Sequence, residues 1–264
     1  MQVPERQQAQ RTTGLFAQPA RLQRYRRATW RFVRNKPLGA TGLAVIFLTL
    51  FVAIFGDFIV RHDPLQMDPT VRLQAPSSTY WLGTDNFGRD VYSHITGGAR
   101  ISIYVGFMSV FIGAGLGGIW GLTSGYLGGR FDLYSQRLVD IKQAIPTLAL
   151  ALVVVASLGS SLNNVVIAIS LGSIGGATRV VRSQAIAVRN MPYIEAVHSI
   201  GANWPRIVFY HVMPNCAAPW IIVATAGLGA AILTEASLSF LGVGVPPPNP
   251  SWGRMLSGVG REYL

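Results

Sequence analysis

Charged residues are scarce in this chain, and acidic ones are scarcer still. Asp, Glu, Lys and Arg make up only 12% of the 264 residues, against roughly a quarter in a typical soluble domain. Half of the residues are apolar, and the 11 acidic residues leave a formal net charge of +11. This composition excludes an ordinary soluble domain and predicts a protein that lies in a lipid bilayer.

Cysteine is also rare, and the common catalytic motifs are absent. Cys216 is the single cysteine, so an internal disulfide and a thiolate metal site are both excluded, and we expect this thiol simply to pack. No H-E-x-x-H or G-x-S-x-G pattern occurs, and neither Lys36 nor Lys142 belongs to a G-x-x-x-x-G-K-[ST] phosphate loop. We therefore expect no catalytic residue, no metal site and no bound cofactor, and the chain is not expected to hydrolyse ATP.

The basic residues gather at the N-terminus. Nine of them precede the first apolar run, where Glu5 is the only acid. These nine are Arg6, Arg11, Arg21, Arg24, Arg26, Arg27, Arg31, Arg34 and Lys36. Such a cluster is typical of a cytoplasmic tail facing anionic lipid, so residues 1–36 are predicted to be that tail, and nucleic acid is not expected as a partner.

Five apolar runs predict five membrane-spanning helices within one domain, residues 37–264. The first run, 38–60, reaches the roughly 20 residues needed to span a bilayer and exceeds the core of a signal peptide. The remaining runs are 101–128, 138–158, 165–181 and 217–245. The predicted fold class is therefore all-α, a polytopic transmembrane helical bundle.

Polar connections join these spans. Residues 61–100 contain three prolines and form a predicted external loop, whose end, 85–100, is expected to lie along the membrane surface. Short polar turns are predicted at 129–137 and 159–164. Arginines at both the N-terminal tail and the 179–206 segment indicate that the N-terminus and this segment are cytoplasmic.

Glycines recur at every fourth residue in the second predicted span and at its end. They are Gly113, Gly117, Gly121, Gly125 and Gly129. Glycines at this spacing expose a strip of helix backbone, which lets a neighbouring helix approach closely in lipid. The strip predicts helix packing, with a flexible gating helix as the alternative.

The polar segment 189–214 separates two apolar stretches and reads RNMPYIEAVHSIGANWPRIVFYHVMP. Asn190 is expected to cap a helix of about three turns with Pro192 at its start, and Gly201 to end it in a left-handed conformation. Ile194 and Val197 fall on one side at helical spacing, together with Gly201 and overlapping Tyr193 and Ile200. We interpret this side as a docking surface, after which Pro214 restarts the chain.

Four stretches of the chain resemble one family. Glu195-Ala196-Val197, Gly201 and His211-Val212-Met213-Pro214 resemble the EAA loop of ATP-binding-cassette importer permeases, with Val197, His211 and Met213 departing from its usual residues. Residues 81–91 (WLGTDNFGRDV), 235–242 (EASLSFLG) and 247–253 (PPNPSWG) resemble the dipeptide, oligopeptide and nickel branch. From the residues alone, 84–90 is a capped turn with an Arg–Asp pair.

The resemblance implies a permease subunit in a bacterial or archaeal inner membrane. A second homologous permease would complete the translocation path, and two separate ATPase subunits would carry ATP and Mg. An external substrate-binding protein would deliver peptides or a related solute such as a nickel chelate, glutathione or an opine. The 190–214 loop would be the ATPase-coupling helix, through Tyr193, Ile194, Glu195, Ala196, Val197, Gly201 and Pro214. The last of the family's six helices is expected to be missing here.

Glu235 lies midway along the fifth predicted span. An ionised carboxylate facing lipid there would cost about 2.5–3.5 kcal/mol, so it should face protein or a wet cavity. Two interpretations stay open: a hydrogen bond between helices, and a lining residue of the substrate path that contacts a positive group such as a peptide amine.

Two other classes of protein are alternatives to an importer permease. An ATP-independent channel or an ion-driven carrier would need acidic or histidine relays inside several spans, and only Glu235 is deeply placed. A membrane enzyme acting on lipid would need clustered His, Asp or Ser at one interface, and the sequence offers no such cluster. A co-purifying ATPase would distinguish the importer from both.

Overall fold

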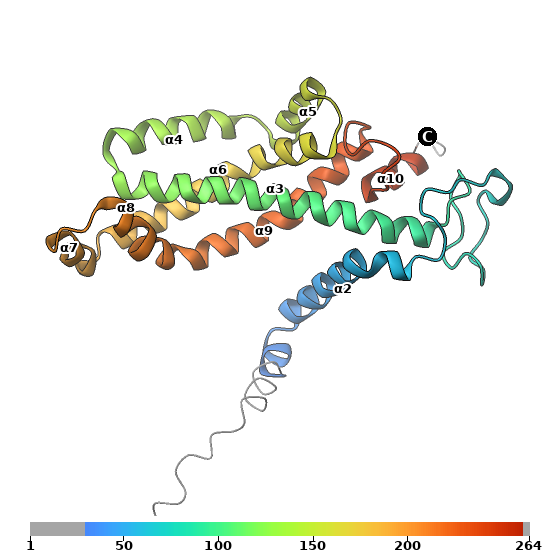
Figure 1. Cartoon of the computed structure of the whole chain (residues 1–264), viewed down its shortest axis with the longest axis horizontal. Coiled ribbons are helices and arrows are strands. Elements are labelled where there is room, and N and C mark those ends of the chain that lie inside the picture. Colours follow the sequence, from blue (N-terminus) through green and yellow to red (C-terminus); the bar gives the residue numbers. More distant parts are fainter. Residues whose placement is uncertain (1–29, 261–264) are drawn as a thin grey trace, which may run out of the picture. The chain divides into compact units, whose positions relative to one another are not determined.

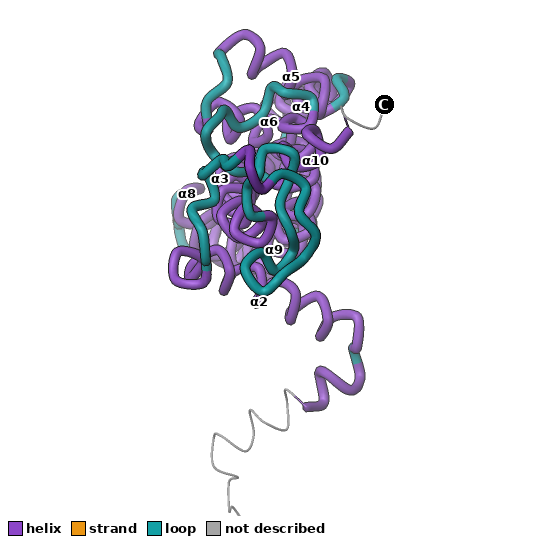
Figure 2. Tube along the Cα trace, turned by 90° about the vertical axis from the view of Figure 1, so that its right-hand side faces the viewer, coloured by secondary structure: helices purple, strands orange, loops and turns teal. Residues whose placement is uncertain are grey.

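The computed structural model describes residues 30–260, and this part of the chain is built from helices (Figure 1; Figure 2). No β-strand occurs within it, apart from one isolated bridge between Thr84 and Asp90. The predicted all-α class is therefore confirmed. Most of the predicted basic tail, residues 1–36, lies outside the described residues.

The chain divides into two compact units, residues 1–50 and 51–264. In the first unit the described residues are helical except Lys36, and α2 (Pro37–Ile59) begins there and ends in the second unit. The second unit holds η2 (Pro69–Val71), α3 (Val91–Leu127), α4 (Gly129–Ala144), α5 (Thr147–Leu158), α6 (Leu162–Arg189), α7 (Pro192–Ser199), α8 (Trp204–Arg206), the π-helix η3 (Ile207–Val212), α9 (Met213–Phe240) and α10 (Trp252–Gly260).

Between residues 30 and 260, four helical runs are long and apolar enough to cross a membrane. They are α2, α3, α6 and the continuous run Trp204–Phe240. The pair α4 and α5 gives a fifth span if the two are counted together, although an 85° bend separates them. The five predicted spans thus have counterparts in the structure, but their bounds need correction.

The second span is longer than predicted. It begins at Val91 instead of residue 101, because the Asp90 side chain accepts a hydrogen bond from the backbone N–H of Ser93 at 3.2 Å and so caps a helix there. Residues 91–100 therefore belong to α3 instead of to the predicted external loop.

The third span is also different. Gly128 and Gly129 adopt φ values of +67° and +58°, so the chain reverses within two residues, and 130–137 belongs to α4 instead of a polar turn. The helix then breaks at Ile145 and Pro146 before α5. Farther along, α6 extends beyond the predicted 165–181 at both ends, and α9 covers 213–240 instead of 217–245.

The centre of the second unit is the packing of α3 along α6, with α9 beside them (Figure 1). A Cβ placed on Gly117 would lie 2.3 Å from the carbonyl oxygen of Ile174, and one on Gly121 would lie 2.2 Å from that of Thr178. Gly113 and Gly125 face α6 carbonyl oxygens in the same way, at 2.4 and 2.7 Å. The glycine strip is thus a packing surface, and its partner is α6. Gly129 is not part of it, because it lies past the end of α3 with open space around it.

Polar contacts attach α4 to α6. Arg182 donates to Asp132 through Nε at 2.6 Å and Nη2 at 2.5 Å, and Arg179 pairs with Asp140 at 2.7 Å. Lys142 donates to the Gly172 carbonyl oxygen at 2.5 Å. Asp140 and Lys142 contact different groups of α6, since residues two apart on a helix do not face each other.

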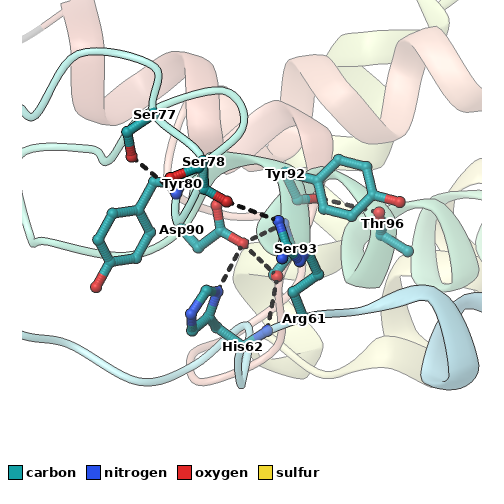
Figure 3. A network of polar contacts seen from close by, with 9 residues as sticks. All are labelled: Arg61, His62, Ser77, Ser78, Tyr80, Asp90, Tyr92, Ser93 and Thr96. Carbon is teal, nitrogen blue, oxygen red and sulfur yellow. Dashed lines mark hydrogen bonds and ion pairs between the residues drawn. The ribbon is translucent and has the colours of Figure 1, made fainter.

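A network of polar contacts holds the loop between α2 and α3 to the start of α3 (Figure 3). Asp90 Oδ2 accepts from the Ser93 hydroxyl at 2.5 Å and lies 3.4 Å from His62 Nδ1, while the backbone N–H of His62 donates to Ser93 Oγ at 3.2 Å. Arg61 donates to the Ser78 carbonyl oxygen at 3.0 Å. The loop is irregular in backbone but fixed in place.

Residues 84–90 form the capped turn with an Arg–Asp pair that the sequence predicts. Asp85 Oδ1 accepts from the backbone N–H groups of Phe87 and Arg89 at 2.8 and 2.9 Å, and its Oδ2 pairs with the Arg89 guanidinium. Gly88 has φ +73°, and the Asp68 carbonyl oxygen occupies the space of a Cβ, so no other residue fits the turn.

The glycine strip gives a testable prediction with an internal control. Gly121→Ala adds a methyl group where the α6 backbone lies, so it should reduce the free energy of unfolding by about 1–3 kcal/mol. Gly115→Ala makes the same change on the same helix where nothing lies within 4 Å. Because Ala favours helix over Gly by about 1 kcal/mol, this variant should be neutral or more stable.

Thermal unfolding of the purified protein in detergent measures both variants. Equal melting temperatures for Gly121→Ala and Gly115→Ala would contradict the close contact between α3 and α6.

Candidate functional site

The polar segment that the sequence singles out lies at one end of the bundle, opposite the loop that precedes α3 (Figure 1). Its helix α7 covers Pro192–Ser199, about two turns instead of the predicted three. Met191 occupies the N-cap position without a side-chain hydrogen bond, and Asn190 ends α6, so the predicted capping role of Asn190 is wrong. Gly201 follows α7 with φ +81° and ends the helix as predicted.

Ile194 anchors α7 to the rest of the bundle. Its side chain is 2% exposed and sits in a buried cluster built from the ends of α3, α6 and α9 together with η3. The other members are Leu122, Tyr126, Val181, Ala185, Val188, Ile207, Val208, Val212 and Cys216. Val197 packs against the same cluster. The apolar side of α7 therefore faces this chain's own core, and the prediction that Ile194 and Val197 form an outward docking surface is wrong.

The opposite side of α7 is exposed. Ile200 is 83% exposed and Tyr193 39%, and Glu195, Ala196 and Gly201 are exposed as well. We call this set of five residues the outer face of α7. The outer face combines an exposed carboxylate, Glu195, with the exposed apolar side chain of Ile200.

The chain continues from α7 into α9 through a π-helix, without the restart expected at Pro214. The π-helix ends at Val212, Pro214 is the second residue of α9, and the helical run continues through it. Asn215 donates to the His211 carbonyl oxygen at 2.8 Å and to Tyr193 Oη at 3.1 Å. Pro214 is exposed near these contacts, which tie α7 to the start of α9.

A cleft of about 480 Å³ opens between α7 and the ends of α3 and α6. Tyr126 Oη lies 2.8 Å from His198 Nε2 across it, and the two rings are nearly parallel. Arg189, Glu195 and Trp204 also line the cleft. Sequence reasoning missed Tyr126, because it lies 72 positions before His198 and carries no local motif.

Glu235 is fully buried and does not line an open path in this structure. Its carboxylate accepts hydrogen bonds from Ser102 of α3 at 3.0 Å and from Ser239 of α9 itself at 2.8 Å. The structure therefore matches the first interpretation of Glu235, a hydrogen bond that holds helices together.

A separate groove of about 270 Å³ lies between α6 and α9. Small and hydroxyl-bearing residues dominate it, among them Gly172, Ser173, Gly176, Gly227 and Thr234. Thr234 lines this groove although its neighbour Glu235 points into the helix contact.

The fold and these features define a polytopic helical membrane protein with a helix exposed at one end. A family model described as "Binding-protein-dependent transport system inner membrane component" matches residues 116–259, and "N-terminal TM domain of oligopeptide transport permease C" matches residues 24–76. The chain belongs to this family of binding-protein-dependent inner-membrane permeases of ATP-binding-cassette transporters.

Named relatives agree with this assignment. The chain is 41% identical over 231 residues to the dipeptide transport system permease protein DppC of Alkalihalophilus pseudofirmus, covering 88% of this chain and 76% of that protein. It is 38% identical over 232 residues to the probable D,D-dipeptide transport system permease protein DdpC of Escherichia coli, covering 88% and 78%. It is 39% identical over 233 residues to the glutathione transport system permease protein GsiD of Pectobacterium atrosepticum, covering 88% and 77%. These relatives are transport permeases and not enzymes.

The same substitution at the two isoleucines of the α7 region should change the free energy of unfolding by very different amounts. Ile194→Ala leaves a cavity in the buried cluster and should reduce the free energy of unfolding by about 2–5 kcal/mol. Ile200→Ala removes an exposed side chain and should change it by no more than about 0.5 kcal/mol.

Thermal unfolding in detergent compares the two variants directly. If Ile200→Ala destabilised the protein as strongly as Ile194→Ala, then the inward and outward sides of α7 would be assigned incorrectly.

Proposed function

We propose that this chain is a permease subunit of an ATP-driven importer in a bacterial or archaeal inner membrane, multi-pass and with a cytoplasmic N-terminus. With a second, homologous permease it encloses a path for peptides or a related small solute. An external binding protein delivers the substrate. Membership of the permease family supports this proposal, and the exposed outer face of α7 is the single observation that carries it.

The outer face of α7 docks on a separate ATPase subunit, one for each permease, and those subunits hold ATP and Mg. Tyr193, Glu195, Ala196 and Ile200 make the contact, and Gly201 sets the turn by which the chain leaves the helix. Val197 and Pro214 flank this contact. Ile200 is the apolar anchor, since it is the most exposed of them.

Ile194 transmits the movement. Because its side chain is buried among residues of α3, α6 and η3, α7 cannot shift without carrying these helices. Closure of the ATPase dimer on binding ATP would thus be passed to the α3–α6 pair, and the bundle would exchange between inward-open and outward-open arrangements.

The translocation path runs along the groove between α6 and α9. Its glycines and hydroxyl groups present little bulk and no fixed charge, which suits solutes that differ in side chain, while selection rests largely with the binding protein. Glu235 lies behind this groove and supports it by joining α9 to α3. In this proposal Glu235 supports the wall of the path from behind, and the small residues of the groove form the surface that the solute meets.

An ATP-independent channel or carrier is the alternative, and no observation favours it. The importer requires an ATPase that co-purifies with the full-length chain from its own cells, and a channel or carrier does not.

Gly201 tests the coupling role. Gly201→Val should abolish ATP-dependent uptake of dialanine in membrane vesicles, since a β-branched residue cannot hold φ +81° without strain, whereas nothing nearby would clash with the added side chain. Gly201→Asn should keep a substantial part of the uptake, because Asn tolerates this backbone conformation.

Both variants should insert into the membrane in normal amounts, which immunoblotting of the membrane fraction checks. Uptake at the normal rate with Gly201→Val would refute a coupling role for this turn.

A further inference from the structure

A cavity of about 400 Å³ lies at the end of the bundle opposite α7. The loop before α3 forms one side of it, and the segment after α9 together with α10 forms the other. Its polar wall carries Asn86, Arg89, His94, Asn249, Arg254 and Ser257. Two arginines thus face one enclosed space, and neither belongs to the site at α7.

Arg89 is held rigidly and its charge is balanced. Its guanidinium pairs with Asp85 at 2.6 Å, its Nε donates to the same carboxylate oxygen at 2.7 Å, and the group lies over the Phe87 ring at 4.8 Å from the centroid. The side chains of Arg89 and Asp85 are only 17% and 21% exposed. The capped turn therefore presents a fixed, mostly buried donor to the cavity.

Arg254 is different, because no carboxylate of residues 30–260 pairs with it. It is half-buried, and burial together with the charge of Arg89 holds the pKa of its guanidinium below its ordinary value. A partly desolvated cation that has no carboxylate partner is unfavourable unless an anion joins it.

The helix that carries Arg254 is firmly placed. Trp252 donates through Nε1 to the Ile95 carbonyl oxygen at 3.0 Å and packs on Gly98, while a Cβ on Gly253 would lie 2.2 Å from the Ala236 carbonyl oxygen. The contacts of its neighbours Trp252 and Gly253 with α3 and α9 thus fix the position of Arg254 at the cavity.

We propose that this cavity binds a carboxylate, namely the C-terminal carboxylate of a peptide on its way into the path. Arg254 pairs with it as the unmatched cation, Asn86 offers amide donors, and the fixed guanidinium of Arg89 offers a further N–H donor. Met67, Pro247 and Pro248 form an apolar wall for the adjoining side chain. The volume falls within the roughly 300–1,000 Å³ typical of small-molecule pockets.

The inference rests on the proposed function, because the location of the cavity suits a peptide only if α7 faces the ATPase. The 37 residues of α3 separate the cavity from α7, which amounts to about 55 Å at 1.5 Å per residue. If α7 faces the ATPase, the cavity faces the side from which peptides arrive.

Two probes that differ in one group test the proposal. N-acetylalanine carries a carboxylate, and N-acetylalaninamide replaces it with a neutral amide. Binding of each to the full-length chain in lipid nanodiscs, without ATPase or binding protein, is measured by saturation-transfer NMR up to about 10 mM, the weak end of specific binding. The acid should bind saturably and the amide should not.

Variants assign the binding to the cavity. Arg254→Gln should weaken binding of the acid by about tenfold or more, and Arg254→Lys should weaken it less because the charge remains. Arg100→Gln, which removes an exposed arginine of α3 that does not line the cavity, should leave binding unchanged. Asn86→Asp places a carboxylate in the cavity without touching α10 and should abolish binding, so the test survives if Arg254→Gln fails to fold.

Equal binding of acid and amide, no binding of the acid, or full binding by Asn86→Asp and Arg254→Gln would overturn the proposal. The measurement uses neither ATP nor transport. A chain that binds the acid but drives no ATP-dependent uptake would refute the proposed function alone, and a chain that transports without binding the acid would refute only the carboxylate site.

Discussion

The second unit depends on the direct contact between the backbones of α3 and α6. Four glycines at every fourth position of α3 lie against carbonyl oxygens of α6, with no side chain between them. Such a contact forms only if the two helices stay in register, because any shift would bring a larger neighbour against a carbonyl. The pair therefore forms a stiff axis. The α7 helix is anchored at one end of it by Ile194, and α10 packs near the other by Trp252.

This axis explains how features far apart in the chain could act together. Near one end, Tyr126 and His198 join α3 to α7, whose outer face is exposed. Near the other, Glu235 accepts hydrogen bonds from Ser102 of α3 and Ser239 of α9, so that α9 is held to α3. Buried polar contacts of this kind fix how helices are arranged, since a slipped arrangement would leave the carboxylate without partners.

Much of the fold could be predicted from periodicity, and little of the side-chain detail could. The apolar runs, the glycine strip and the turn at Gly201 are local patterns, and each is present. Helix starts were missed where one side chain decides them, as Asp90 does for α3. The inward direction of Ile194 was missed because an amphipathic pattern identifies an apolar side but does not say whether this chain or a partner covers it. The surroundings of Glu235 and Arg254 depend on residues more than a hundred positions away.

The most direct measurement asks whether α7 and α3 move as one body. Spin labels are placed at Ser199 and at Tyr104, both exposed, in a protein whose single native Cys216 is replaced by Ser. A third label is placed on the second permease of the proposed assembly, and pulsed EPR reports the separations with and without ATP. We expect the distance from Ser199 to Tyr104 to stay the same while that from Ser199 to the second permease changes. A shift between Ser199 and Tyr104 on addition of ATP would contradict rigid transmission through Ile194.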